Sequence, residues 1–256
     1  MADLPQPRSL YRLLHESFRA AFSAPVAASC LAVLQLLHAV AVLFTVEQAR
    51  QLDGVFTPWM SLLVAVIASP FELLALTVLA HHHCGVRLPT SSAVGRAFAL
   101  FPAYLAWSLL LGFLDLLPAL LLGSSVLPVA TVQKLLAATI VIEGAGVRSA
   151  WRALICASRF QALGFVLAFA MPLPLHPVTR WMSLGLGEFM RVLPFGEIPA
   201  VRFWLTAGLA AGIAIPLSLF LMSWTVAVVL DGLVREQAAK ERTRRHHDRL
   251  DTRPGG

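Results

Sequence analysis

Hydrophobic residues in this chain come in blocks long enough to cross a lipid bilayer. Six nearly charge-free runs recur along its 256 residues, at about 24–46, 56–80, 98–122, 126–142, 160–175 and 203–230. A helix needs roughly 20 mostly apolar residues to cross the hydrocarbon core, and loops or sheet edges cannot face lipid unpaired. The pattern predicts an all-α, polytopic integral membrane protein with six transmembrane helices.

The composition agrees with a membrane protein. Hydrophobic residues make up 58% of the chain and charged residues only 13%, whereas a soluble domain carries about 25% charged residues. The net charge is +6, but the cations sit in short segments that flank the apolar runs. Cations placed there orient a membrane protein and contact anionic lipid. We therefore expect the lipid bilayer and anionic lipids as partners, and no nucleic acid.

The basic residues also predict a topology. They concentrate in the N-terminal segment, in the segments after the second and fourth apolar runs, and in the tail. The opposite loops contain only Arg50, Arg180, Arg191 and Arg202. The positive-inside rule then places both termini in the cytoplasm, and an even number of spans agrees.

Three segments on the expected cytoplasmic side resemble one another. Each is amphipathic and carries an Arg-Ala pair just before an apolar run, at Arg19-Ala20, Arg96-Ala97 and Arg152-Ala153. Such helices lie in the membrane interface and lead the chain into the bilayer. The pattern predicts three transmembrane hairpins, each preceded by an amphipathic cytoplasmic helix. The likeness has two alternative explanations. One is an internal duplication, and the other is that any helix entering the bilayer from the cytoplasm requires similar residues.

Two further segments complete the organisation. The proline-rich segment 177–202 contains Trp181–Val192, which we interpret as a short interfacial helix, with a re-entrant lid as the alternative. After Asp231-Gly232 the chain becomes rich in Arg, Glu and His, which predicts a solvated helix or a disordered tail. We therefore expect a six-helix transmembrane domain at 1–234 and a charged cytoplasmic tail at 235–256.

Two ionisable residues lie deep within apolar runs, Glu72 in the second and Lys134 in the fourth, whereas Asp115 lies near the outer end of the third, close to water. Charges are costly in lipid, so both should face the bundle interior or water. They form either an internal ion pair that fixes helix register or part of a pathway for an ion, a proton or a charged headgroup.

His81, His82, His83 and Cys84 are weak candidates for a metal site. Three adjacent histidines on one helix point in three directions, whereas structural zinc sites use separated ligands. We interpret them as a polar cap at the end of the second span, and we expect no metal and no cofactor. The chain has no recognisable catalytic motif, so we do not expect an enzyme.

The most structured segment follows the fourth run. Glu143 ends that run, and Gly144 and Gly146 permit a sharp turn. A helix is predicted from about Val147, with one cationic stripe and an adjoining apolar face that includes Trp151. The stripe consists of Arg148, Arg152 and Arg159. This geometry suits a helix on an anionic membrane surface, and Glu143 is placed to bridge to one of these arginines.

The sequence Glu143-Gly144, followed by Ala150-Trp151-Arg152-Ala153-Leu154, resembles the membrane-domain family of glycerophosphodiester phosphodiesterases and its stand-alone bacterial multi-span relatives of unknown function. Ala153 stands where that family usually has a second arginine. The resemblance implies six helices and a bacterial-type plasma membrane. It does not imply phosphodiesterase activity, because that activity resides in a separate soluble domain.

These observations favour a membrane protein with a scaffold, accessory or regulatory role, which implies a partner membrane protein. One alternative is a transporter or lipid-handling protein that uses the intramembrane residues Glu72 and Lys134. Another is a membrane enzyme that acts on lipid headgroups from the cytoplasmic arginine stripe.

Overall fold

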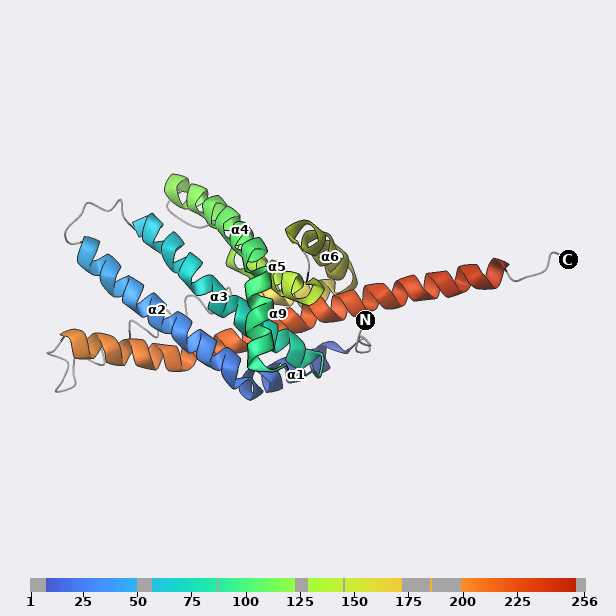
Figure 1. The fold of residues 1–256 in the computed structure, drawn as a ribbon, viewed down its shortest axis with the longest axis horizontal. Coiled ribbons are helices and arrows are strands. Elements are labelled where there is room, and N and C mark those ends of the chain that lie inside the picture. The colour runs from blue at the N-terminus through green and yellow to red at the C-terminus, as the bar shows by residue number, and fades with distance from the viewer. Residues whose placement is uncertain are drawn as a thin grey trace.

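In a computed structural model, the described residues are 8–49, 57–86, 88–122, 129–144, 146–171, 185 and 199–251. All regular structure within them is helical (Figure 1). The helices are α1 (Leu10–Ser23), α2 (Pro25–Ala49), α3 (Thr57–His83), α4 (Thr90–Leu122), α5 (Val129–Glu143), α6 (Val147–Phe160), α7 (Ala162–Ala170) and α9 (Pro199–Asp251). The expected all-α class is confirmed for this part of the chain.

Each of the six apolar runs overlaps one helix: α2, α3, α4, α5, α7 or α9. Within the described residues, Thr90–Leu111 and Phe203–Arg244 are long and apolar enough to cross a membrane, and each bent helix pair adds one more if it counts as a span. The 15 residues of α5 and the nine of α7 are fewer than the roughly 20 that a span needs. This part of the chain thus contains two to four membrane-length helices, against the six expected.

Two sharp bends separate amphipathic helices from the apolar helices that follow them. α1 meets α2 at 74° beside Ala24, and α6 meets α7 at 105° beside Gln161. Ser9 caps α1 by accepting a hydrogen bond from the Arg12 amide at 3.3 Å. Two of the three expected lead-in helices are therefore separate helices. The third, around Arg96, is continuous with the apolar part of α4.

Helix α9 runs through the centre of the bundle (Figure 1) and contacts α1, α2, α3, α5, α6 and α7. Its middle part, residues 222–232, is buried, and Trp224 there is fully enclosed. A helix that is apolar on all sides must be surrounded by protein or lipid, which explains why this stretch forms the core.

Helix α6 packs against α9 through small residues. Its buried face consists of Ala150, Leu154 and Ala157. Opposite Ala157, α9 presents Gly232, where a Cβ atom would lie only 2.6 Å from the Ala157 carbonyl oxygen. Only glycine permits this approach, so the contact sets the distance between the two helices.

Two expectations concern the end of the chain. Helix α9 continues without a break from 235 to 251, so the expected boundary between a domain at 1–234 and a tail at 235–256 lies inside one helix. The expected surface helix Trp181–Val192, in segment 177–202, lies outside the described residues apart from Gly185.

Candidate functional site

A buried carboxylate joins three distant segments at one end of the bundle. Asp231, on α9, is only 3% exposed. It accepts hydrogen bonds from the Arg8 amide at 2.7 Å, from Gln161 Nε2 at 2.8 Å and from Arg235 Nε at 2.6 Å. Arg235 also donates to the Arg8 carbonyl at 2.6 Å. The N-terminal segment, the bend between α6 and α7, and α9 thus converge on one side chain.

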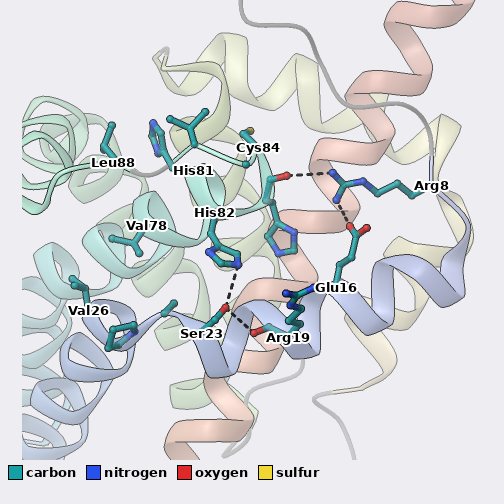
Figure 2. A pocket seen from close by; sticks show the side chains of 15 residues that line it. Arg8, Glu16, Arg19, Ser23, Val26, Val78, His81, His82, Cys84 and Leu88 are labelled. Carbon is teal, nitrogen blue, oxygen red and sulfur yellow. Dashed lines mark hydrogen bonds and ion pairs between the residues drawn. The ribbon is translucent and has the colours of Figure 1, made fainter.

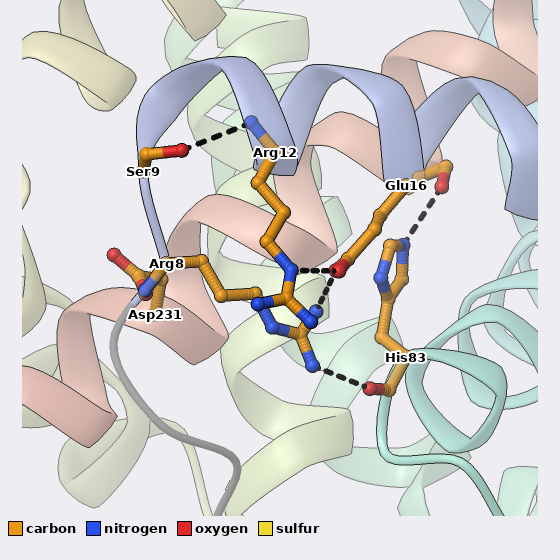
Figure 3. A network of polar contacts seen from close by, with 7 residues as sticks. Arg8, Ser9, Arg12, Glu16, His83 and Asp231 are labelled. Carbon is orange, nitrogen blue, oxygen red and sulfur yellow. Dashed lines mark hydrogen bonds and ion pairs between the residues drawn. The ribbon is translucent and has the colours of Figure 1, made fainter.

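Arg8 extends this network to α1 and α3 (Figure 3). Its guanidinium forms an ion pair with Glu16 and donates to the His83 carbonyl at 3.2 Å. Arg12 also binds Glu16, with 2.8 Å between Nε and Oε1. We call this set the polar junction; it consists of Arg8, Glu16, His83, Gln161, Asp231 and Arg235. Its members balance each other's charge, as buried ionic groups require.

The three histidines at the end of α3 point to three different helices. His81 Nδ1 donates to the Thr77 carbonyl at 2.8 Å, which leaves Nε2 to accept from Arg96 on α4 at 3.2 Å. His82 Nε2 lies 3.1 Å from Ser23 Oγ of α1, and His83 Nε2 lies 2.8 Å from Ser223 Oγ of α9.

These directions bear on the metal hypothesis. Within the part of the chain that the structure describes, no group of three or more His, Cys, Asp or Glu side chains is arranged to hold a metal ion. Each ring instead connects α3 to another segment. Cys84, the next residue, is exposed.

Arg96 links the ends of three helices. Besides contacting His81, it donates to the Val141 carbonyl of α5 at 3.2 Å. The last carbonyls of a helix lack partners within the helix, and a cation satisfies them well. The Arg-Ala pair of the second lead-in segment therefore has a structural role.

An open cavity of about 820 Å³ lies between α1, the start of α2 and the end of α3 (Figure 2). Ser23 and His82 lie in its wall, and their contact resembles a nucleophile beside a base. However, Ser23 Oγ donates to the Arg19 carbonyl at 2.8 Å, so it accepts from His82. A histidine that donates this hydrogen bond cannot remove the serine proton. The pair is thus arranged to connect α1 with α3.

Glu72 lies in a polar cluster between α3, α4 and α5. Its carboxylate accepts a hydrogen bond from the Tyr104 hydroxyl, and Gln133 Nε2 donates to Tyr104 at 3.3 Å and to Ser108 at 3.1 Å. Lys134 is half-buried and, among the described residues, forms no ion pair with Glu72. Glu72 therefore has a hydroxyl partner on α4, and the ion pair with Lys134, one of the two alternatives, is not formed.

We expect Glu72 to be coupled energetically to Tyr104 and not to Lys134. Tyr104→Phe should lower the free energy of unfolding by about 1–2 kcal/mol, because it leaves the carboxylate without its donor. Double-mutant cycles with Glu72→Gln, measured by denaturation in detergent, should give a coupling of about 1 kcal/mol for Tyr104. The cycle with Lys134→Met should be additive within about 0.5 kcal/mol. The reverse ranking would restore the ion-pair hypothesis.

His83 predicts a pH dependence of stability. His83 lies just beyond the apolar run 56–80. Burial, with a further contribution from Arg8, lowers the pKa of this ring from 6.5 to about 4. The folded protein keeps the ring neutral while the unfolded chain takes up a proton below pH 6.5. The free energy of unfolding should therefore fall by about 2 kcal/mol between pH 7 and pH 5 through this group. The same titration of His83→Gln should lack this component, and identical pH profiles would contradict it.

The segment after α5 forms the predicted turn. Gly144 has φ +63°, a left-handed conformation that favours glycine, whereas Gly146 has ordinary extended geometry at φ −66°. Only one of the two glycines is therefore required by the backbone. Helix α6 begins at Val147, where the sequence predicts it.

Helix α6 presents the predicted cationic stripe. Arg148, Arg152 and Arg159 are exposed, and within the described residues none of them forms an ion pair. Glu143 is also exposed and bridges to none of them. Trp151 packs against Trp107 of α4 with 5.7 Å between ring centroids. The helix is thus fixed on one side while its arginines project outward.

The sequence analysis did not identify several members of the Glu72 cluster and of the polar junction. Tyr104 and Ser108 are four residues apart on α4 and so share a helical face, a signal visible in the sequence. Asp231 and Gln161 carry no comparable signal, because their partners are far away along the chain.

Comparisons with models of known protein families, with curated proteins and with solved structures found no match for this chain.

Proposed function

We propose that this chain is a six-span protein of a bacterial-type plasma membrane, with both termini in the cytoplasm, and that it acts as a non-enzymatic scaffold or accessory subunit. The observation that carries the topology is the polar junction. The N-terminal segment, the end of α3, the bend after α6 and the end of the core part of α9 meet there. These are the four regions to which the positive-inside rule assigns a cytoplasmic location. The resemblance of Glu143–Leu154 to the phosphodiesterase membrane-domain family belongs to the same proposal.

In this proposal, helix α6 is the element that contacts anionic lipid and a partner protein. Its buried face holds it against α9, and its arginines are free of intramolecular ion pairs within the described residues. Ile155 and Trp151 are about two-fifths exposed. An interfacial helix combines exposed apolar groups with cations in this way. Anionic lipid then anchors the helix, which presents a rigid platform to a partner membrane protein.

The depth of α6 in the membrane tests this proposal. A nitroxide on Ile155→Cys, in a background with Cys30, Cys84 and Cys156 changed to serine, should report burial at the headgroup boundary in vesicles of phosphatidylglycerol. Arg148→Gln combined with Arg152→Gln should move the label toward water, because each cation near an anionic surface contributes about 1 kcal/mol. A label that is equally water-exposed in both proteins would rule out the surface helix.

The second candidate is a lipid-handling or transport protein. The cluster of Glu72, Tyr104, Ser108 and Gln133 favours it, because polar groups at the middle of membrane helices mark pathways. Native mass spectrometry of protein released gently from its own membrane distinguishes the candidates. A retained protein subunit supports the accessory role, and a small molecule lost on Glu72→Gln supports transport.

A further inference from the structure

The cavity between α1, α2 and α3 exists because of the bend at Ala24. The 74° angle between α1 and α2 leaves a corner, and the end of α3 forms the opposite wall (Figure 2). The volume of about 820 Å³ lies within the usual range for small-molecule sites. The polar wall includes Arg8, Glu16, Arg19, Ser23 and His82, and the apolar wall includes Val26, Val78, Val86 and Leu88.

Among the described residues that line this cavity, the only carboxylate is that of Glu16. It is already bound by Arg8 and by Arg12. Arg19 also faces the cavity, and within the described part of the chain its guanidinium forms no ion pair or hydrogen bond. Within the described residues, Arg19 is therefore an exposed cation without an ion pair, and its guanidinium N–H groups are available to a ligand.

The start of a helix lies at the same corner. The first turn of α2, at Pro25 and Val26, lines the cavity, and a helix begins with positive partial charge. Ser23 and His82 also line this corner, but their donors are already used, by the Arg19 carbonyl and by Ser23 Oγ respectively. Arginine binds phosphate through a planar fork of N–H groups. An anion with several oxygens would bind Arg19 and the start of α2 together.

The apolar wall narrows the ligand class. A bare inorganic ion would make no use of the valines and leucine opposite Arg19, whereas an ester carries carbon groups beside its phosphate. On α1, Phe18 and Phe22 are exposed, with 4.7 Å between the centroids of their tilted rings. In the proposed membrane orientation these rings face the lipid. This part of the inference therefore rests on the proposed function.

We propose that this cavity binds a phosphate ester, with the phosphate on Arg19 and the first turn of α2, and the carbon part against Val26, Val78, Val86 and Leu88. An anionic phospholipid headgroup and a soluble glycerol phosphate share this chemistry.

The test uses the full chain in detergent, with binding counted by native mass spectrometry. The probes are phosphatidylglycerol, phosphatidylcholine, glycerol 3-phosphate and inorganic phosphate. We expect the wild type to bind phosphatidylglycerol or glycerol 3-phosphate well above inorganic phosphate, and phosphatidylglycerol above phosphatidylcholine. Arg19→Gln should weaken binding of the preferred ester roughly tenfold, since a charged hydrogen-bonding group is lost.

Matched variants keep the test independent of folding. Arg242→Gln makes the same charge change on the exposed end of α9 and should leave binding unchanged. Arg19→Lys should retain most of it. Preference for phosphatidylglycerol assigns the ester to a lipid, and equal binding of glycerol 3-phosphate assigns it to a soluble compound. Equal binding by wild type and Arg19→Gln, or equal loss in Arg242→Gln, would overturn the site. This binding test needs no bilayer, whereas the α6 depth measurement does. Failure of the phosphate-ester site can therefore be distinguished from failure of the proposed function.

Discussion

Asp231→Ala is expected to lower the free energy of unfolding by about 3–5 kcal/mol, the largest effect of any single substitution considered for this protein. The carboxylate is buried and accepts three hydrogen bonds, from Arg8, Gln161 and Arg235. Removing it leaves those donors without a partner and the Arg235 charge uncompensated. Denaturation in detergent, followed by circular dichroism, measures the change.

The control for this substitution is Glu143→Ala. Glu143 is an exposed carboxylate at the end of α5, so its removal should change stability by less than about 0.5 kcal/mol. Asp231→Asn keeps the shape and one acceptor oxygen but loses the charge and turns an NH2 group toward one of the donors, so it should fall between the two. If Asp231→Ala were as mild as Glu143→Ala, the polar junction would not hold these segments together.

Gly232→Ala is expected to cost about 3 kcal/mol, because overpacking a tight contact forces the backbone to move. The new Cβ atom would lie 2.6 Å from the Ala157 carbonyl oxygen and 2.9 Å from the Ala157 Cβ atom. Since the carbonyl belongs to the backbone of α6, the whole helix must shift. The same detergent denaturation, together with the position of a label on α6, reports both consequences.

Two glycines on the same helix provide matched controls. Nothing lies within 4 Å of a Cβ atom at Gly208 or at Gly212. Alanine there should be neutral or stabilise α9 by up to about 1 kcal/mol, because alanine is the better helix former. Adding Ala157→Gly to Gly232→Ala should restore only part of the loss, since the carbonyl oxygen stays in place. Equal behaviour at 208, 212 and 232 would show that α6 does not pack closely on α9.

The sequence predicts where the helices lie because hydrophobic runs and their flanking cations are local signals. The start of α6 at Val147 and the left-handed turn at Gly144 follow from a few neighbouring residues. The bends at Ala24 and Gln161 are less visible. Each bend arises because an amphipathic helix and the apolar helix after it are stable in different environments. In the sequence, only the change from amphipathic to uniformly apolar residues indicates such a bend.

The candidate site was harder to predict because its contacts connect residues far apart in sequence. Arg8 and Asp231 are separated by more than 200 residues, and neither stands out from its neighbours in the sequence. Glu72 can be identified from the sequence because a carboxylate within an apolar run is conspicuous. Its partner Tyr104 cannot, because a tyrosine is common in a membrane helix.

The side chains at the end of α3 show the same limit. Periodicity correctly predicts that His81, His82 and His83 diverge, because successive residues on a helix point about 100° apart. It does not reveal that each ring meets a different segment, or that a cavity opens beside Arg19. These features depend on the angle between α1 and α2.

The orientation of Cys84 tests the central proposal most directly. Cys84 is an exposed residue at the end of α3, although desolvation by the neighbouring protein raises the pKa of its thiol. Labelling should therefore use mildly alkaline conditions that favour the thiolate. In a variant with Cys30→Ser and Cys156→Ser, a membrane-impermeant maleimide should label inside-out vesicles and leave right-side-out vesicles unlabelled. Labelling of Cys84 in right-side-out vesicles would contradict a cytoplasmic polar junction, and with it the proposed topology.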